Sequence, residues 1–105
     1  DMRVELLPIS EAEKIVSTVP SGIVDIFREL YERFQSLDSW SEESIKEAFI
    51  AVTSRLGEDL VKSFYTYFYR VITGKDSGPR AAPLLALLGR ELSLKYILLA
   101  TRTRA

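Results

Sequence analysis

The chain has 105 residues, a net charge of −1 and a hydrophobic content of 47%, values typical of one compact globular domain. It has no cysteine and no histidine, which argues against disulfides, thiolate metal sites and the usual general base, so we expect neither a catalytic nor a metal site. No apolar run is long enough for a membrane span or a signal peptide, so we expect a cytoplasmic protein with no membrane partner.

Helical periodicity runs through every long segment and predicts an all-α fold, a single compact bundle of five or six helices over residues 1–105. The first helix is expected where Ser10 can serve as the N-cap and Glu13 completes a capping box. Pro20 ends this helix or precedes the next one. The second helix begins after Ser21, because apolar side chains then recur every three or four positions.

The third and fourth helices are expected within residues 38–57 and 58–74. Each begins with serines or acids, which suit the positive end of a helix dipole. Each ends at a glycine, and a left-handed C-terminal cap is predicted at both Gly57 and Gly74. The periodicity places Tyr65 on the buried face of the fourth helix.

The last two helices are short and rich in leucine. Pro79 is expected at the first position of the fifth helix, which stops at Gly89. Pro83 lies near the first turn, where proline is tolerated. The sixth helix follows within residues 90–105.

Charge is distributed unevenly along the chain. Through Asp59 there are thirteen acidic and six basic residues, a net charge of −7, whereas the remainder has eight basic and two acidic residues, a net charge of +6. Such asymmetry indicates a nucleic-acid or anionic-membrane partner. The alternative is that the two halves neutralise each other in the fold.

One face of the fourth helix combines an aromatic ring with a guanidinium group. At about 100° per residue, Ser63, Thr66, Tyr67 and Arg70 lie opposite the apolar stripe, so Tyr67 is expected to be partly exposed. A single-stranded nucleotide could stack its base on this ring while the arginine holds its phosphate. Alternatively, Tyr67 packs against a neighbouring helix.

The segment TGKDSGPR joins the fourth and fifth helices and carries Lys75 and Arg80. Next to the positive end of the fifth helix, these cations could hold an anion. The segment does not have the residue order of a Walker A phosphate loop. An ordinary helix-loop-helix corner would explain Gly74, Gly78 and Pro79, but it would not explain the charges.

Two stretches, WSEESIKEAFIAVTSRLG and FYTYFYRVITGKDSGPRAAPLLALLG, resemble the C-terminal anticodon-binding region of class I aminoacyl-tRNA synthetases of the glutamyl and lysyl kinds. Class I lysyl enzymes, found mainly in archaea and some bacteria, are the more similar. They carry an aromatic-rich helix, a GK-x-x-GPR turn and a short apolar helix. The residues that match this turn are Gly74, Lys75, Gly78, Pro79 and Arg80.

The resemblance implies an α-helix cage that binds the anticodon stem-loop of a tRNA, which is tRNA-Lys for a lysyl enzyme. It also implies a catalytic domain in the same polypeptide, which activates the amino acid with ATP and Mg²⁺, so no cofactor is expected in this domain. The HIGH and KMSKS signatures of such catalytic domains do not occur in the chain. Because the chain begins with Asp1 rather than methionine, we expect it to be a fragment of a longer synthetase.

Charge and helix position select the candidate nucleic-acid-binding residues. Tyr67 is expected to stack on a base. The residues expected to bind phosphates are Arg70, Lys75, Arg80, Arg90 and Lys95.

Two alternatives stay open. The first is the C-terminal domain of a glutamyl-tRNA synthetase, because Ala81, Ala82 and Leu84 depart from the residues usual in lysyl enzymes. The second is a helical protein-interaction module that self-associates through the apolar segment 82–100.

Overall fold

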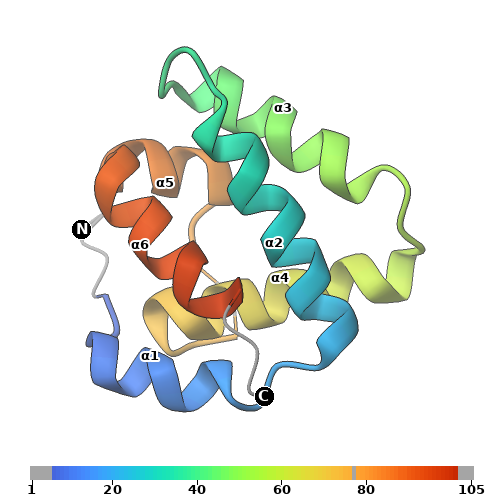
Figure 1. The fold of residues 1–105 in the computed structure, drawn as a ribbon, viewed down its shortest axis with the longest axis vertical. Helices are drawn as coiled ribbons and strands as arrows, with labels where there is room; N and C mark the ends of the chain where they lie inside the picture. The colour runs from blue at the N-terminus through green and yellow to red at the C-terminus, as the bar shows by residue number, and fades with distance from the viewer. Residues whose placement is uncertain (1–5, 77, 102–105) are drawn as a thin grey trace.

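The computed structural model describes residues 6–76 and 78–101. Over these residues the chain forms six helices and no strand, which confirms the all-α bundle (Figure 1). The helices are α1 (Ile9–Val16), α2 (Ser21–Gln35), α3 (Glu42–Thr53), α4 (Glu58–Thr73), α5 (Ala81–Leu88) and α6 (Arg90–Thr101). No helix among the described residues is both long and apolar enough to cross a membrane.

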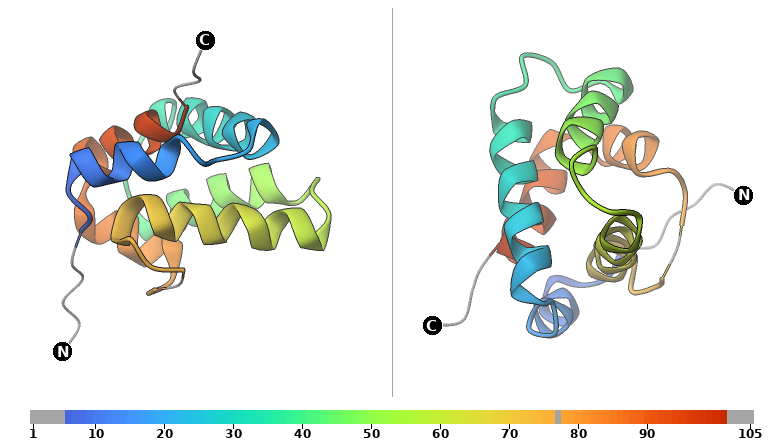
Figure 2. Two further views of the ribbon diagram at one scale, coloured as in Figure 1. Left: turned by 90° about the horizontal axis from the view of Figure 1, so that it is seen from below. Right: turned by 90° about the vertical axis from the view of Figure 1, so that its right-hand side faces the viewer.

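The helices pack in pairs around one core. The most extensive contact is between α2 and α6, followed by that between α3 and α5, while α1 lies against both α4 and α6 (Figure 2). Five phenylalanines from α2, α3 and α4 fill the centre: Phe27, Phe34, Phe49, Phe64 and Phe68. Their rings meet in edge-to-face and tilted pairs with centroids 5.0 to 6.3 Å apart, a favourable aromatic geometry.

The glycine after α4 has the predicted conformation, but the glycine before α4 does not. Gly74 has a φ of +79° and its N–H donates to Arg70 O at 2.9 Å, which confirms the left-handed C-terminal cap. The prediction for Gly57 was wrong, because its φ is −71° and it is the N-cap of α4. Helix α3 has already ended at Thr53, so Gly57 belongs to the start of the following helix.

Two predicted helix starts are shifted. Ser10 is not the N-cap of α1: the carbonyl of Pro8 accepts the N–H groups of Glu11 and Ala12 at 3.0 and 2.9 Å, so the helix begins earlier. Pro79 is not the first residue of α5, which begins after the N-cap Arg80.

The segment before α1 fixes the end of α4 in place. The N–H of Leu7 donates to Ile72 O at 2.8 Å, and the hydroxyl of Tyr96 in α6 donates to Leu7 O at 2.5 Å. A Cβ added to Gly74 would lie 2.9 Å from Leu7 Cδ1, so the chain passes directly over this glycine. The C-terminal end of α4, from which the turn to α5 leaves, is therefore held by both α6 and the segment that leads into α1.

Candidate nucleic-acid interface

Tyr69 clamps the turn between α4 and α5 against α4. Its hydroxyl donates to Pro79 O at 2.6 Å. A Cβ on Gly78 would lie 3.2 Å from Tyr69 Cδ1, so a larger residue at this position would press on the ring. The glycine and proline of the predicted corner thus have structural roles, and Arg80 follows directly as the N-cap of α5.

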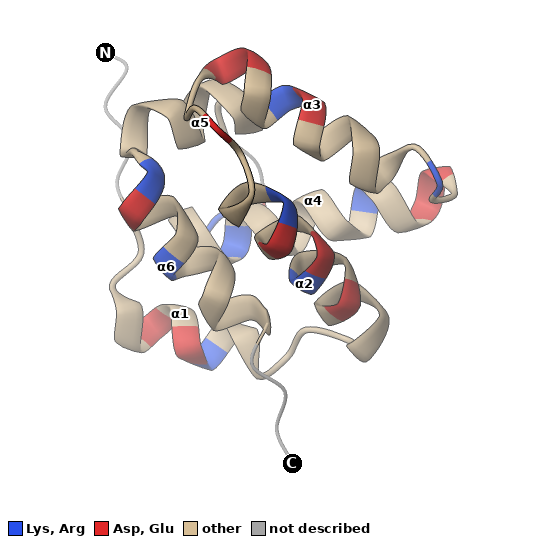
Figure 3. Ribbon diagram, turned by 45° about the horizontal axis from the view of Figure 1, so that its top comes forward, with Lys and Arg blue, Asp and Glu red and all other residues tan. Residues whose placement is uncertain are grey.

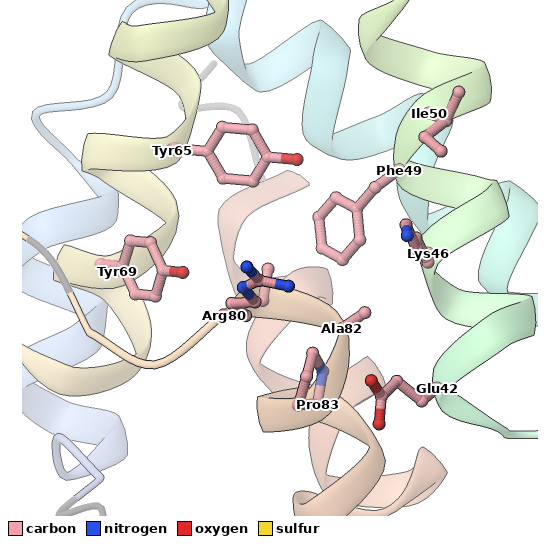
Figure 4. A pocket seen from close by; sticks show the side chains of 10 residues that line it. Glu42, Lys46, Phe49, Ile50, Tyr65, Tyr69, Arg80, Ala82 and Pro83 are labelled. Atoms are coloured by element: carbon pink, nitrogen blue, oxygen red, sulfur yellow. The ribbon is translucent and has the colours of Figure 1, made fainter.

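A cleft of about 440 Å³ opens between α3, α4 and the start of α5 (Figure 4). Helix α3 contributes one side and α4 the other, and the segment from Arg80 to Pro83 closes the end. The residues that line it are Glu42, Lys46, Phe49, Ile50, Tyr65, Tyr69, Arg80, Ala81, Ala82 and Pro83. Its volume is within the range of small-ligand pockets, about 300 to 1,000 Å³.

Aromatic rings and polar groups face each other across this cleft. Figure 4 shows Tyr65 and Tyr69 projecting from α4 toward α3, with the Arg80 side chain between the two helices. Phe49 is buried and lies in the wall formed by α3. Lys46 and Arg80 bring positive charge and Glu42 a carboxylate, so the cleft offers flat apolar surface together with hydrogen-bonding groups of both kinds.

Burial changes the acidity of the two phenols. Desolvation raises the pKa of Tyr65 above its ordinary value of 10.0, and the neighbouring Tyr69 raises it further. Desolvation also raises the pKa of Tyr69. Both phenols are therefore neutral at pH 7. The Tyr69 hydroxyl already donates to Pro79 O and can accept a further hydrogen bond, whereas the Tyr65 hydroxyl can donate one.

The helix projection placed Arg70 and Tyr67 on one face of α4, and in the structure the Arg70 guanidinium group lies over the Tyr67 ring. The guanidinium carbon of Arg70 lies 5.5 Å from the centroid of the Tyr67 ring. Tyr67 is half-buried and packs on the core, so one part of its ring is covered and another part is accessible. Arg70 Nε also donates to Asp76 Oδ1 at 2.6 Å, and this bond raises the pKa of Arg70 and lowers that of Asp76.

The six candidate residues fall into two groups. Tyr67, Arg70, Lys75 and Arg80 belong to the end of α4 and the turn that follows, whereas Arg90 and Lys95 are on α6. Helix α5 separates Arg80 from Arg90 by about 12 Å, at 1.5 Å per residue. Of the first group, Arg70 and Tyr67 are in contact and Arg80 lines the cleft, whereas the α6 pair lies beyond α5.

Arg90 already has partners within the fold. Its Nη2 donates to Phe34 O and Gln35 O, at 3.2 and 2.8 Å, in the last turn of α2. Its guanidinium carbon also lies 6.0 Å from the Trp40 ring centroid. Lys95 is exposed on α6. A role of either residue in binding RNA stays a prediction.

Both α2 and α3 carry acidic and basic residues, with acids in the majority (Figure 3). Five ion pairs occur among the described residues: Lys14–Glu11, Arg28–Asp25, Arg33–Glu29, Arg55–Glu29 and Arg70–Asp76. Four of them lie before Asp59 and the fifth after it, so none of these five joins the acidic half of the chain to the basic half. These ion pairs therefore do not neutralise one half of the chain with the other.

Sequence reasoning missed most of the cleft. Tyr65 was predicted to be buried, yet it is only half-buried and lines the opening. Lys46 and Glu42 were not candidates, although their spacing of four residues places them on one face of α3. One available signal was that tyrosine, not phenylalanine, occupies positions 65 and 69, because a phenol needs a polar partner or an opening to water.

Comparisons with known proteins agree with this geometry. A family model described as "Anticodon binding domain" matches residues 4–100. A lysine--tRNA ligase from Aeropyrum pernix is 41% identical over 66 residues, which are 63% of this chain and 12% of that protein. The chain therefore spans only a small part of the relative's length. No solved structure matches the chain.

Proposed function

The chain belongs to the anticodon-binding domain family, and we propose that it binds the anticodon stem-loop of a tRNA as part of a lysine--tRNA ligase. The observation that carries this proposal is the cleft between α3, α4 and α5, directly beside the charged turn. An unpaired base needs a flat apolar surface and hydrogen-bonding groups, and the adjoining backbone needs cations. This end of the bundle supplies all three.

The cleft is assigned to one splayed base and the turn to phosphates. Tyr65 and Tyr69 offer rings and neutral hydroxyls, while Arg80 reaches into the cleft from the turn. Lys75 is exposed on the turn, and Arg70 lies over the Tyr67 ring near the end of α4. A base bound in the cleft would place its own backbone near Arg80 and the turn that carries Lys75, which gives salt-sensitive affinity.

The lysyl identity rests on the similarity to the Aeropyrum pernix lysine--tRNA ligase. The glutamyl alternative rests on Ala81, Ala82 and Leu84 in α5, which differ from the residues usual in lysyl enzymes. In this proposal the RNA partner is tRNA-Lys. Activation of lysine with ATP and Mg²⁺ belongs to a catalytic domain in another part of the polypeptide, and the protein works in the cytoplasm. The chain itself contributes affinity and the choice of tRNA.

The apolar segment 82–100 is mostly used inside the fold. Leu84, Leu85, Ile97 and Leu99 are among its buried residues, and Leu87 and Leu98 are the large apolar side chains that it exposes. Self-association through this segment therefore has little surface available. The structure favours the RNA-binding function over the self-association alternative.

A binding titration of the 105-residue chain tests the proposal. A tRNA-Lys anticodon hairpin is titrated at about 50 mM and about 200 mM salt, and its affinity should fall as salt rises. The double substitution Lys75→Ala with Arg80→Ala should weaken binding and reduce the salt slope by about 0.7 for each phosphate that is no longer neutralised. An unchanged affinity would remove the turn as a phosphate site.

The matched control removes two cations elsewhere. Lys14, in the last turn of α1, and Arg55, between α3 and α4, lie away from the turn at the C-terminal end of α4. Lys14→Ala with Arg55→Ala changes the net charge by the same amount and should leave the affinity nearly unchanged. Equal losses of affinity in both double variants would show general attraction to charge instead of a site.

Aminoacylation by the complete parent protein separates the two subclasses. With this region present, the parent should charge tRNA with lysine, and deletion of the region should lower kcat/KM for the tRNA. Charging with glutamate would replace the lysyl assignment by the glutamyl one.

A further inference from the structure

Asp76 lies among the cations of the proposed phosphate site. Its Oδ1 accepts a hydrogen bond from Arg70 Nε at 2.6 Å. It is the one acidic residue in the described part of the α4–α5 turn, which also carries Lys75 and Arg80. The Asp76 side chain is 70% exposed and that of Arg70 is 40% exposed, so both can be reached from solution.

The turn itself builds this contact. Gly74 has a left-handed conformation and ends α4 with a bond from its N–H to Arg70 O. The chain then reverses, which brings the residue six positions after Arg70 back beside it. The same guanidinium group lies over the Tyr67 ring, with its carbon 5.5 Å from the ring centroid. Arg70 is therefore already occupied when no RNA is bound.

A carboxylate and a phosphate compete for the same guanidinium group, because both are anions that accept charge-assisted hydrogen bonds. A phosphate that reaches Arg70 or the adjacent Lys75 also comes close to the negative charge of Asp76. From this geometry we propose that Asp76 competes with RNA phosphate for Arg70 and thereby keeps the affinity of the turn for RNA backbone low. This inference rests on the proposed function.

Such competition sets a threshold for binding. Every RNA presents phosphates, so a site built only from cations would retain any RNA of sufficient length. Asp76 lowers the affinity for all of them by the same factor. Only an RNA that also places a base in the cleft between α3, α4 and α5 then binds tightly enough to be retained.

Asp76→Asn tests the competition, because asparagine keeps an oxygen that can accept from Arg70 but removes the charge. Two hairpins of equal length are titrated, one with the tRNA-Lys anticodon loop and one with a scrambled loop. For both, affinity at about 0.1 M salt should rise about fivefold, and the salt slope should become steeper by about 0.7, as for one additional neutralised phosphate. Unchanged or weaker binding would overturn the inference and indicate that Asp76 orients Arg70.

Two further variants identify the origin of the gain in affinity. Glu91→Gln makes the same change in net charge in the first turn of α6, beyond the far end of α5, and should give little gain. In an Arg70→Ala background, Asp76→Asn should also give little gain, because the contested group is gone. An equal gain in either case would overturn the inference.

Failure of the proposed function gives a different result. If the unaltered chain binds neither hairpin at low salt, the RNA-binding function itself is wrong. If the unaltered chain binds the anticodon hairpin and Asp76→Asn binds it no better, the function stands and the role of Asp76 is wrong. Thermal unfolding followed by circular dichroism checks that each variant is folded.

Discussion

Arg90 offers the sharpest test of the fold, because it joins two elements that are distant in sequence. It is the first residue of α6, and its Nη2 reaches Phe34 O and Gln35 O at the end of α2. These carbonyls belong to the last turn of α2, where C=O groups have no partner within their own helix, although Phe34 O also accepts the N–H of Leu37 at 3.3 Å. Arg90→Ala should therefore loosen the packing of α2 on α6, the most extensive in the bundle.

The size of the effect follows from the interactions that the arginine makes. A hydrogen bond from a charged donor contributes about 1.5 to 3 kcal/mol, and the two acceptors share one nitrogen, so we count one bond. The cation–π interaction with Trp40 adds about 0.5 to 1 kcal/mol. Because water can hydrate the freed carbonyls in part, the free energy of unfolding should fall by about 2 kcal/mol. For a domain of this size, that lowers Tm by about 10 °C.

Urea and thermal unfolding followed by circular dichroism measure this change. Lys95→Ala is the control on the same helix, because Lys95 is exposed and its removal should change stability by less than about 0.5 kcal/mol. Arg90→Lys should be intermediate, since lysine keeps the charge but not the planar fork. A melting temperature of Arg90→Ala within about 2 °C of the unaltered chain would refute the reasoning.

The same variants separate a structural role of Arg90 from an RNA-binding role. Affinity for the anticodon hairpin is measured at a temperature where all variants are folded. If Arg90 acts only in the fold, Arg90→Ala binds RNA as tightly as the unaltered chain. A weaker affinity with a smaller salt slope would support the predicted phosphate contact instead.

Three further predictions concern the turn and its supports. Gly74→Ala should cost about 1 to 3 kcal/mol in urea unfolding, because φ is +79° and the new Cβ meets Leu7. Tyr96→Phe removes the bond to Leu7 O and should cost about 1 kcal/mol, with faster hydrogen exchange at the Leu7 amide. Because the pKa values of Tyr65 and Tyr69 are raised, their phenolate absorbance should appear above pH 10, and stability should fall as pH rises through those pKa values.

Each of these predictions has a control. Gly22→Ala places a methyl group in α2 where nothing lies within 4 Å, so it should not destabilise, and a cost equal to that of Gly74→Ala would contradict the conformational argument. Tyr31→Phe changes a half-buried tyrosine of α2 and should leave Leu7 exchange unchanged. Tyr65→Phe and Tyr69→Phe should each remove part of the high-pH absorbance. Titration of either phenol below pH 10 would contradict the direction of the shift.

The helices were predictable because their signals are local. Apolar spacing, acids at helix starts and Gly74 after α4 all act within one or two turns of chain. Gly57 shows where local reasoning fails. A glycine between two helices can end the first or begin the second, and the choice depends on where the first helix stops, which the sequence pattern leaves uncertain by several residues.

The charged turn was predictable, whereas the cleft was not. Lys75 and Arg80 are close in sequence, so their proximity follows from one short loop. The cleft requires α3 to lie across from α4, which depends on packing between helices that no local pattern specifies. The partners of Arg90 lie 55 and 56 residues away along the chain, so a helix projection could show a cation but not its acceptors.

Contacts between uncharged groups hold the turn between α4 and α5. This matters because the same turn carries cations of the proposed phosphate site. Tyr69 binds the Pro79 carbonyl, Leu7 pairs with Ile72, and Gly74 closes α4 without any ionised group. The ion pair between Arg70 and Asp76 also ties the turn to α4, but the neutral contacts do not involve it, so they can hold the turn when a phosphate replaces Asp76. A site whose charges were also its structural ties would unfold in part when it bound RNA. Here the ties of the turn other than that ion pair are neutral and do not include Lys75, so substitutions at Lys75 should alter affinity and leave stability unchanged.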